Sequence, residues 1–231
     1  MRVDVVIPAL NEARAIGGVV ARIPRPPVRD VYVVDNGSTD GTAEIARAAG
    51  AKIVLERRRG YGSACLAGIA ALPSDTDIVV FLDADGSDDP DELHSLIAPI
   101  VDDRADLVIG SRSLGAAERG ALTPQQRVGN AIAATWLRTR FDLPATDLGP
   151  FRAIRRSSLA ALGMVDTNYG WTVEMQIKAA QRGLRYAEVP AAYKRRIGES
   201  KVSGTVRGVI GASYKILGLL AWYDLGPGRR H

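Results

Sequence analysis

An apolar run, Ile78-Val79-Val80-Phe81-Leu82, leads directly into the acidic segment Asp83-Ala84-Asp85-Gly86-Ser87-Asp88-Asp89-Pro90. A short, continuous apolar run bounded by polar residues predicts a strand buried on both faces of a parallel sheet. Open α/β sheets bind ligands just beyond the carboxyl ends of such strands. The carboxylates that follow this run are therefore expected at a ligand site.

Asp83 and Asp85 stand two residues apart, so in an extended chain both carboxylates point to the same side. Two such carboxylates form a hard-oxygen site that suits Mg²⁺ or Mn²⁺, typically with a substrate diphosphate completing the coordination shell. The alternative is an acidic turn that only caps the next helix, with Asp89 as N-cap and Pro90 as the first helical residue. The residues alone leave both interpretations of Asp83 and Asp85 open.

Composition restricts the class of protein and of partner. With 231 residues, 46% hydrophobic and 24% charged, the chain fits one globular domain, or one domain with an extension. The net charge is +4, but aromatic and basic residues do not interleave, so we expect anionic small molecules or an anionic membrane face as partners and no nucleic acid. A single cysteine, Cys65, fits a reducing cytoplasm, and we expect neither a signal peptide nor a membrane-spanning segment.

Strand and helix patterns alternate from residue 1 to about 110, which predicts a doubly wound, mostly parallel sheet with helices on both faces. The predicted strands are 3–7, 31–34, 53–55, 78–82 and 106–109. Asn11 is the predicted N-cap of the first helix. Beyond residue 110 the pattern changes, with helices at 124–140, 172–182 and 203–223, and we expect this half to supply the other wall of the site.

Three predicted strand ends carry polar residues and together form a pocket rim: Pro8-Ala9-Leu10-Asn11-Glu12, Asp35-Asn36-Gly37-Ser38-Thr39-Asp40-Gly41-Thr42 and Asp83-Ala84-Asp85. Glycines in the second segment let the backbone approach a ligand, although Asn-Gly is also an ordinary turn signal. The segment Gly60-Tyr61-Gly62-Ser63-Ala64 is not a dinucleotide fingerprint, because Cys65 stands where the third glycine belongs.

In order and spacing, these three segments resemble those of family 2 glycosyltransferases with the GT-A fold. The resemblance is more specific to the dolichyl- or polyprenyl-phosphate sugar synthase branch, and it extends over roughly residues 3 to 205. The further motifs that carry it are Gly60-Tyr61-Gly62-Ser63-Ala64, Gly110-Ser111-Arg112, Asp147-Leu148-Gly149-Pro150-Phe151-Arg152 and Arg196-Ile197-Gly198-Glu199-Ser200-Lys201.

The resemblance implies transfer of a sugar from a nucleotide-sugar with inversion at the anomeric carbon. Asp35 would bind the base or the ribose, and Asp83 and Asp85 would hold the diphosphate through Mg²⁺ or Mn²⁺. The other residues implied in substrate binding are Pro8, Ala9, Asn11, Glu12, Asn36, Gly37, Gly62 and Ala84. Arg112, Arg196 and Lys201 would supply positive charge near the diphosphate or an acceptor phosphate. The alternative interpretation is that these three residues only form a solvated basic surface.

The acceptor determines which residues take part in catalysis. A lipid phosphate arrives ionised and needs no general base, whereas a hydroxyl group must give its proton to a carboxylate, for which Asp147 and Glu174 are the candidates. The alternative role of Glu174 is structural, because the helix dipole favours a carboxylate at a helix start. For Trp171 the two interpretations are stacking on a sugar and packing in the core. Pro150 departs from the motif of the branch and removes a backbone donor there.

The expected function is hexose transfer to a polyprenyl or dolichyl phosphate at the cytoplasmic membrane face. UDP-glucose is the favoured donor, since Asp83-Ala84-Asp85-Gly86 is closer to the glucosyl enzymes, and GDP-mannose is the second. The alternatives are a soluble hydroxyl acceptor, or a non-catalytic nucleotide-sugar-binding protein of the same fold.

The predicted organisation is a glycosyltransferase domain of residues 1–202 and a helical extension of residues 203–231. Within the domain, residues 1–110 form the nucleotide-sugar-binding half and residues 111–202 the acceptor half. The last helix lies on a membrane, packs on the domain or forms a homo-oligomer. The nearby cations Lys194, Arg195, Arg207, Lys215, Arg229 and Arg230 favour an anionic membrane.

Overall fold

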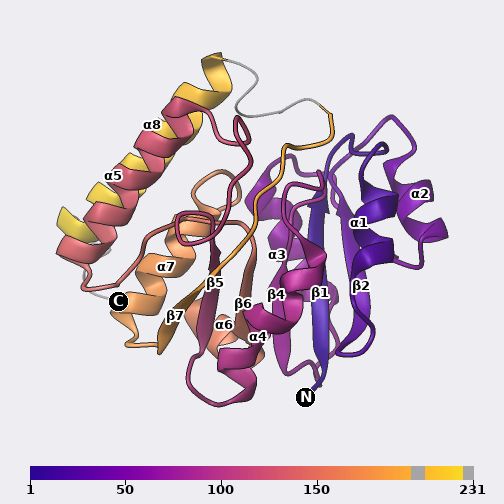
Figure 1. The fold of residues 1–231 in the computed structure, drawn as a ribbon, viewed down its shortest axis with the longest axis horizontal. Helices are drawn as coiled ribbons and strands as arrows, with labels where there is room; N and C mark the ends of the chain where they lie inside the picture. The colour runs from indigo at the N-terminus through magenta and orange to yellow at the C-terminus, as the bar shows by residue number, and fades with distance from the viewer. Residues whose placement is uncertain (199–205, 226–231) are drawn as a thin grey trace.

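The computed structural model describes residues 1–198 and 206–225, and for residues 206–214 only the course of the backbone. Within these ranges, seven strands form one sheet in the order β3-β2-β1-β4-β6-β5-β7 (Figure 1). The strands are β1 (Val3–Ala9), β2 (Val28–Asp35), β3 (Lys52–Leu55), β4 (Ile78–Phe81), β5 (Leu107–Ser111), β6 (Arg152–Arg155) and β7 (Tyr186–Pro190). The helices are α1 (Ile16–Arg22), α2 (Thr42–Ala48), α3 (Tyr61–Ala71), α4 (Leu93–Val101), α5 (Pro124–Arg140), α6 (Arg156–Leu162), α7 (Trp171–Gln181) and α8 (Val206–Leu225), with a 3-10 turn, η1 (Pro90–Glu92), before α4.

Helices cover both faces of the sheet because successive strand residues point to opposite sides. On one face, Val5 of β1 packs in a buried cluster with Ile16 of α1 and Leu96 of α4. On the other face, Val6 belongs to a second cluster that contains residues of α3, α6 and α7. The predicted doubly wound, mostly parallel α/β architecture is confirmed.

Strand β6 is the exception to the parallel pattern. It lies between β4 and β5 and runs antiparallel to both, with Val80 opposite Ala153 and Leu107 opposite Ile154. All other strand pairs are parallel among the described residues. Residues of the second half of the chain therefore enter the sheet beside β4.

Two local predictions are wrong. Strand β1 does not end before Pro8 but continues to Ala9, because its pairing with β2 extends to Ala9. Its pairing with β4 stops earlier, at Val6. Helix α1 starts at Ile16, and Asn11 is not its N-cap but adopts a left-handed conformation with φ of 53°. The cap at Asp89 is confirmed, since its carboxylate accepts a hydrogen bond from the backbone of Asp91.

Helices α5 and α8 lie side by side beyond the β7 edge of the sheet (Figure 1). Together with α7 they bury a third apolar cluster, which includes Leu137, Ile177 and Leu220. Helix α8 thus packs on the rest of the chain. In the part of the chain that the structure describes, no helix is both long and apolar enough to cross a bilayer. The predicted boundary after residue 202 falls in 199–205, outside the described residues.

Candidate active site

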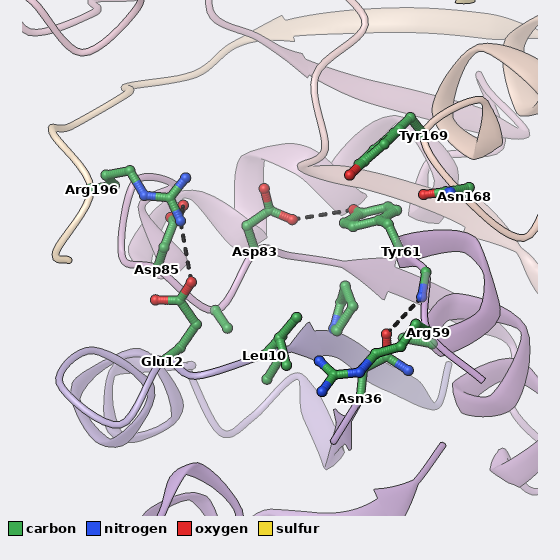
Figure 2. Close-up of a pocket in the computed structure, with 15 residues that line it drawn as sticks. Leu10, Glu12, Asn36, Arg59, Tyr61, Asp83, Asp85, Asn168, Tyr169 and Arg196 are labelled. Atoms are coloured by element: carbon green, nitrogen blue, oxygen red, sulfur yellow. Dashed lines mark hydrogen bonds and ion pairs between the residues drawn. The ribbon is translucent and has the colours of Figure 1, made fainter. Parts of the chain in front are cut away.

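A cavity of about 330 Å³ opens at the carboxyl ends of β1, β2 and β4, where an open α/β sheet binds its ligands. Residues from both halves of the chain line it (Figure 2): Pro8, Ala9, Leu10, Glu12, Asn36, Arg59, Gly60, Tyr61, Ala64, Asp83, Ala84, Asp85, Asn168, Tyr169 and Arg196. Eight of the predicted site residues belong to this lining: Pro8, Ala9, Glu12, Asn36, Asp83, Ala84, Asp85 and Arg196.

Asn11 joins two of the rim loops and does not itself line the cavity. Its backbone N–H donates to Ser38 Oγ at 2.9 Å, and its side-chain oxygen accepts from the N–H of Thr39 at 2.8 Å. The backbone N–H of Glu12 donates to Thr42 Oγ1 at 2.9 Å. These bonds connect the loop after β1 to the loop after β2, so they hold the rim in shape.

The loop after β2 is also held internally. The Asp35 carboxylate accepts the N–H of Ser38 at 3.0 Å, and Asp35 does not line the cavity. Asn36 does line it, and its amide donates to the carbonyls of Glu56 and Arg58 while its oxygen accepts the N–H of Gly60. Asn36 thereby holds the segment that brings Arg59 to the cavity.

Gly37 has a φ of 86°, which favours glycine, and also lies outside the lining. A Cβ at this position would lie 3.4 Å from the guanidinium carbon of Arg59. In this structure the neighbour that comes close to Gly37 is thus a side chain of the protein itself.

Three carboxylates follow β4 closely. Burial, together with the charge of Asp85, raises the pKa of Asp83 to about 7, although the Tyr61 hydroxyl donates to Asp83 Oδ1 at 3.2 Å. Burial and the charge of Asp83 raise the pKa of Asp88 well above its usual range. Asp85 is held through one oxygen, which accepts from the backbone N–H and the hydroxyl of Ser87 at 2.9 and 2.5 Å. The second oxygen of Asp85 points toward Arg196.

These carboxylates suit a divalent cation. Burial and, after it, the like charge of Asp85 raise the pKa of Asp83, and a cation between Asp83 and Asp85 would favour the charged form of both. Within residues 1–198 and 206–225, no group of three or more acidic, histidine or cysteine side chains is arranged to hold an ion by itself. A metal at this place would therefore need further ligands, which the oxygens of a diphosphate can supply.

Arg196 places a positive charge beside Asp85 and Glu12. Its Nη2 lies 3.1 Å from Asp85 Oδ2 and 3.2 Å from Glu12 Oε1, and Figure 2 shows it beside both carboxylates. The backbone N–H of Ile197 donates to the carbonyl of Asp85 at 2.9 Å, which fastens this segment to the loop after β4. The predicted partner of Arg196, Lys201, lies outside the described residues.

Arg112 and Asp147 form a buried pair that does not line the cavity. The Arg112 guanidinium donates twice to the Asp147 carboxylate, at 2.8 and 2.6 Å, and the backbone N–H of Arg112 donates at 2.7 Å. The guanidinium also lies over the ring of Tyr193, 5.0 Å from its centroid. With its oxygens so engaged, Asp147 positions Arg112, and the geometry does not support a role as general base.

Glu174 is likewise engaged away from the cavity. Its carboxylate accepts the backbone N–H groups of Val165 and Asp166 and pairs with Lys178 at 2.7 Å. The expectation that it could take a proton from an acceptor is not supported by this arrangement. Trp171 is fully buried and contacts Phe81 edge-to-face at 4.6 Å, so it packs in the core.

Gly62 does not line the cavity but packs under one of its walls. A Cβ at Gly62 would lie 2.1 Å from the carbonyl oxygen of Asp166, and a Cβ at Gly60 would lie 2.2 Å from that of Thr167. The backbone N–H of Ser63 donates to the Thr167 carbonyl at 2.9 Å. The glycines at the start of α3 thus let the segment 166–168 come close.

That segment leads to Asn168 and Tyr169, two lining residues that the sequence interpretation missed. They lie in the turn between α6 and α7 and face the cavity opposite Asn36 and Arg59 (Figure 2). Only the neighbouring residues Trp171 and Glu174 were singled out beforehand. The available signal was Asp166, whose carboxylate accepts the N–H groups of Asn168 and Gly170 and so shapes a turn.

Comparison with known proteins agrees with this architecture. The family model for glycosyl transferase family 2 matches residues 4–163. An uncharacterised glycosyltransferase of Mycobacterium tuberculosis is 44% identical over 210 residues, which cover 90% of this chain and 93% of the relative. The undecaprenyl-phosphate mannosyltransferase of Micrococcus luteus is 32% identical over 237 residues and 97% of each chain.

Among solved structures, this chain is similar to glucosyl-3-phosphoglycerate synthase of Mycobacterium tuberculosis in complex with Mn²⁺, UDP and phosphoglyceric acid. The TM-score is 0.78 at 26% identity, over 98% of this chain and 79% of that one. The fold is that of the GT-A glycosyltransferases. Sequence, fold and family match agree that this chain is a glycosyltransferase and belongs to glycosyl transferase family 2.

Proposed function

We propose that this protein transfers a hexose from a nucleotide-sugar to the phosphate of a polyprenyl phosphate, with inversion at the anomeric carbon. The observation that carries the proposal is the meeting of Asp83, Asp85 and Arg196 in one cavity at the end of β4. Negative charge develops on the nucleoside diphosphate as it leaves. Groups that are already oriented toward that charge lower the barrier.

In this proposal Asp83 and Asp85 hold Mg²⁺ or Mn²⁺, which neutralises charge on the leaving diphosphate. Arg196 contributes a second positive charge once its contacts with Asp85 and Glu12 are exchanged for contacts with the donor. The nucleoside would lie on the side of Pro8, Ala9, Asn36 and Arg59. Mn²⁺ with UDP in the related synthase structure supports the choice of ion.

The engagement of Asp147 and Glu174 outside the cavity favours an acceptor that arrives as an anion. A phosphate is ionised before it reacts, so it needs no carboxylate to take its proton. The name of the undecaprenyl-phosphate relative supports a lipid phosphate. UDP-glucose and GDP-mannose are the donors to compare, the first from the sequence interpretation and the second as its alternative.

We also propose that the pair of helices α5 and α8 meets an anionic membrane surface, where such an acceptor resides. Exposed apolar side chains on the pair are Val128, Ile132, Leu217, Trp222 and Leu225. Helix α5 carries three arginines and no acidic residue. Apolar side chains that are flanked by cations suit a helix in the plane of an anionic interface.

The test is a transfer assay with UDP-glucose and GDP-mannose, with Mn²⁺ or with chelator, and two acceptors. Polyprenyl phosphate in vesicles that contain anionic lipid should be glycosylated, and binding to these vesicles should decrease with salt. Phosphoglyceric acid is the second acceptor, because the structural likeness to its synthase favours it as the alternative. Turnover of phosphoglyceric acid alone, by a protein that ignores vesicles, would refute the lipid acceptor and leave the donor site intact.

A further inference from the structure

The turn of residues 166–170 forms the cavity wall opposite the nucleotide side. Asn168 and Tyr169 come from this turn and lie on the other side of Tyr61 from Asn36 and Arg59 (Figure 2). Both side chains carry groups that donate and accept hydrogen bonds. In the proposed donor pose, the diphosphate lies at Asp83 and Asp85, so the group beyond it on this side is the hexosyl group.

A single carboxylate organises the turn. Asp166 Oδ1 accepts the N–H of Asn168 at 2.7 Å and the N–H of Gly170 at 3.2 Å. The other oxygen, Oδ2, lies 2.9 Å from Nζ of Lys215 on α8. The Asp166 side chain is 4% exposed, so Lys215 supplies the counter-charge of a buried group.

Helix α8 also contacts the turn directly. A Cβ added to Gly170 would lie 2.0 Å from Cδ1 of Leu219, one helical turn after Lys215. On its other side, the turn rests on the glycines at the start of α3. Its position is therefore determined by two helices that are far apart in the sequence.

We propose that Lys215 is a positioning residue, which by its ion pair with Asp166 holds the turn that presents Asn168 and Tyr169 to the hexosyl group of the donor. The inference rests on the proposed donor. It assigns to α8 a role in sugar recognition in addition to packing. It also gives this half-exposed cation of α8 a partner within the protein, where a membrane-facing role was expected.

The chain contains a matched control for stability. Arg140 of α5 pairs with Asp224 of α8 at 2.7 Å, and the side-chain exposures are 48% and 6%. The corresponding values for Lys215 and Asp166 are 47% and 4%. Both pairs fasten α8 through a half-exposed cation and a buried aspartate, but Arg140 and Asp224 lie outside the turn and the cavity lining.

The experiment measures Kd by calorimetry, with Mn²⁺, for UDP and UDP-glucose and for GDP and GDP-mannose. Lys215→Met should weaken binding of the sugar nucleotide about fivefold, which corresponds to about one net hydrogen bond. Binding of the nucleoside diphosphate alone should change by less than about twofold, since this ligand lacks the hexosyl group. Lys215→Arg should bind the sugar nucleotide as the wild type does. Arg140→Met should lose about as much thermal stability as Lys215→Met but leave both affinities unchanged.

Equal affinities in Lys215→Met and wild type would overturn the proposal, and so would an equal loss for UDP and UDP-glucose. If Lys215→Met does not fold, Asn168→Ala, a change at an exposed side chain, provides the test. It should show the same selective loss of sugar-nucleotide binding. Normal UDP-glucose binding by Asn168→Ala would refute the role of the turn. A wild-type protein that binds no sugar nucleotide would refute the proposed function and this inference together. That failure is recognised in the wild type alone, before any variant is compared.

Discussion

Substituting Gly62 tests whether close packing under the 166–168 segment shapes the cavity. Gly62 is the second residue of α3, and a Cβ there would lie 2.1 Å from the Asp166 carbonyl oxygen and 2.7 Å from the Thr167 carbonyl carbon. Because both atoms belong to the backbone, no side-chain rotation can relieve the overlap. The segment has to move by about 1 Å to restore ordinary contact.

The balance of two effects gives the magnitude for Gly62→Ala. Alanine is a better helix former than glycine by about 1 kcal/mol in a helix interior, and by less at the first turn. Overpacking costs about 1–3 kcal/mol, and loss of the hydrogen bond from Ser63 to Thr167 costs about 1 kcal/mol more. The expected net destabilisation is about 2 kcal/mol, or roughly 4–8 °C in Tm for a chain of this size.

The assay is thermal unfolding followed by titration with UDP-glucose or GDP-mannose in the presence of Mn²⁺. Gly18→Ala is the matched control, since Gly18 lies in α1 and a Cβ there meets nothing within 4 Å. It should raise stability by about 0.5–1 kcal/mol. If Gly62→Ala were as stable as the control and bound the donor normally, close packing of α3 against the turn would not be what places Asn168.

The remaining predictions concern three carboxylates. Asp85→Asn keeps an acceptor for Ser87 but loses the negative charge, so the variant should fold and bind the donor without dependence on Mn²⁺. Its turnover should decrease at least about 10²-fold. A variant that is fully active and still metal-dependent would contradict the proposed metal site. Asp147→Asn leaves Arg112 as a buried, unpaired cation and should lower the free energy of unfolding by about 3–5 kcal/mol in urea titrations, whereas an unchanged midpoint would argue against the pair. Glu174→Gln should lose about 1–3 kcal/mol of stability but keep most of its kcat with polyprenyl phosphate, and a kcat reduced to background would restore Glu174 as a candidate base.

Several site residues could be predicted from the sequence because their positions depend on local structure. A buried strand ends where its apolar run ends, and parallel strands end at one edge of the sheet, so the residues after β1, β2 and β4 meet there. Pro8, Glu12, Asn36, Asp83 and Asp85 reached the cavity for this reason. The hydrophobic pattern alone also predicted helices on both faces.

Other residues make contacts that the sequence did not indicate, because their partners are distant in sequence. Asp147 is a plausible base until Arg112, which is 35 residues earlier, takes up its carboxylate. Lys215 is a half-exposed cation, and only the structure shows that it pairs with the buried carboxylate of Asp166. Charge and residue type are the same in both interpretations, so only the neighbours in space distinguish them.

By itself the sequence determined the alternation of strands and helices in the first half, the family resemblance and the acidic pair at the end of β4, because periodicity and strand-end chemistry are local properties. Only the tertiary structure decided which carboxylates face the cavity and which form buried ion pairs. It also brought Asn168 and Tyr169 to the wall, since their turn is held between α3 and α8 by contacts that span about 50 to 100 residues of sequence. Such contacts depend on how the helices pack on the sheet, and no pattern within one segment encodes that packing.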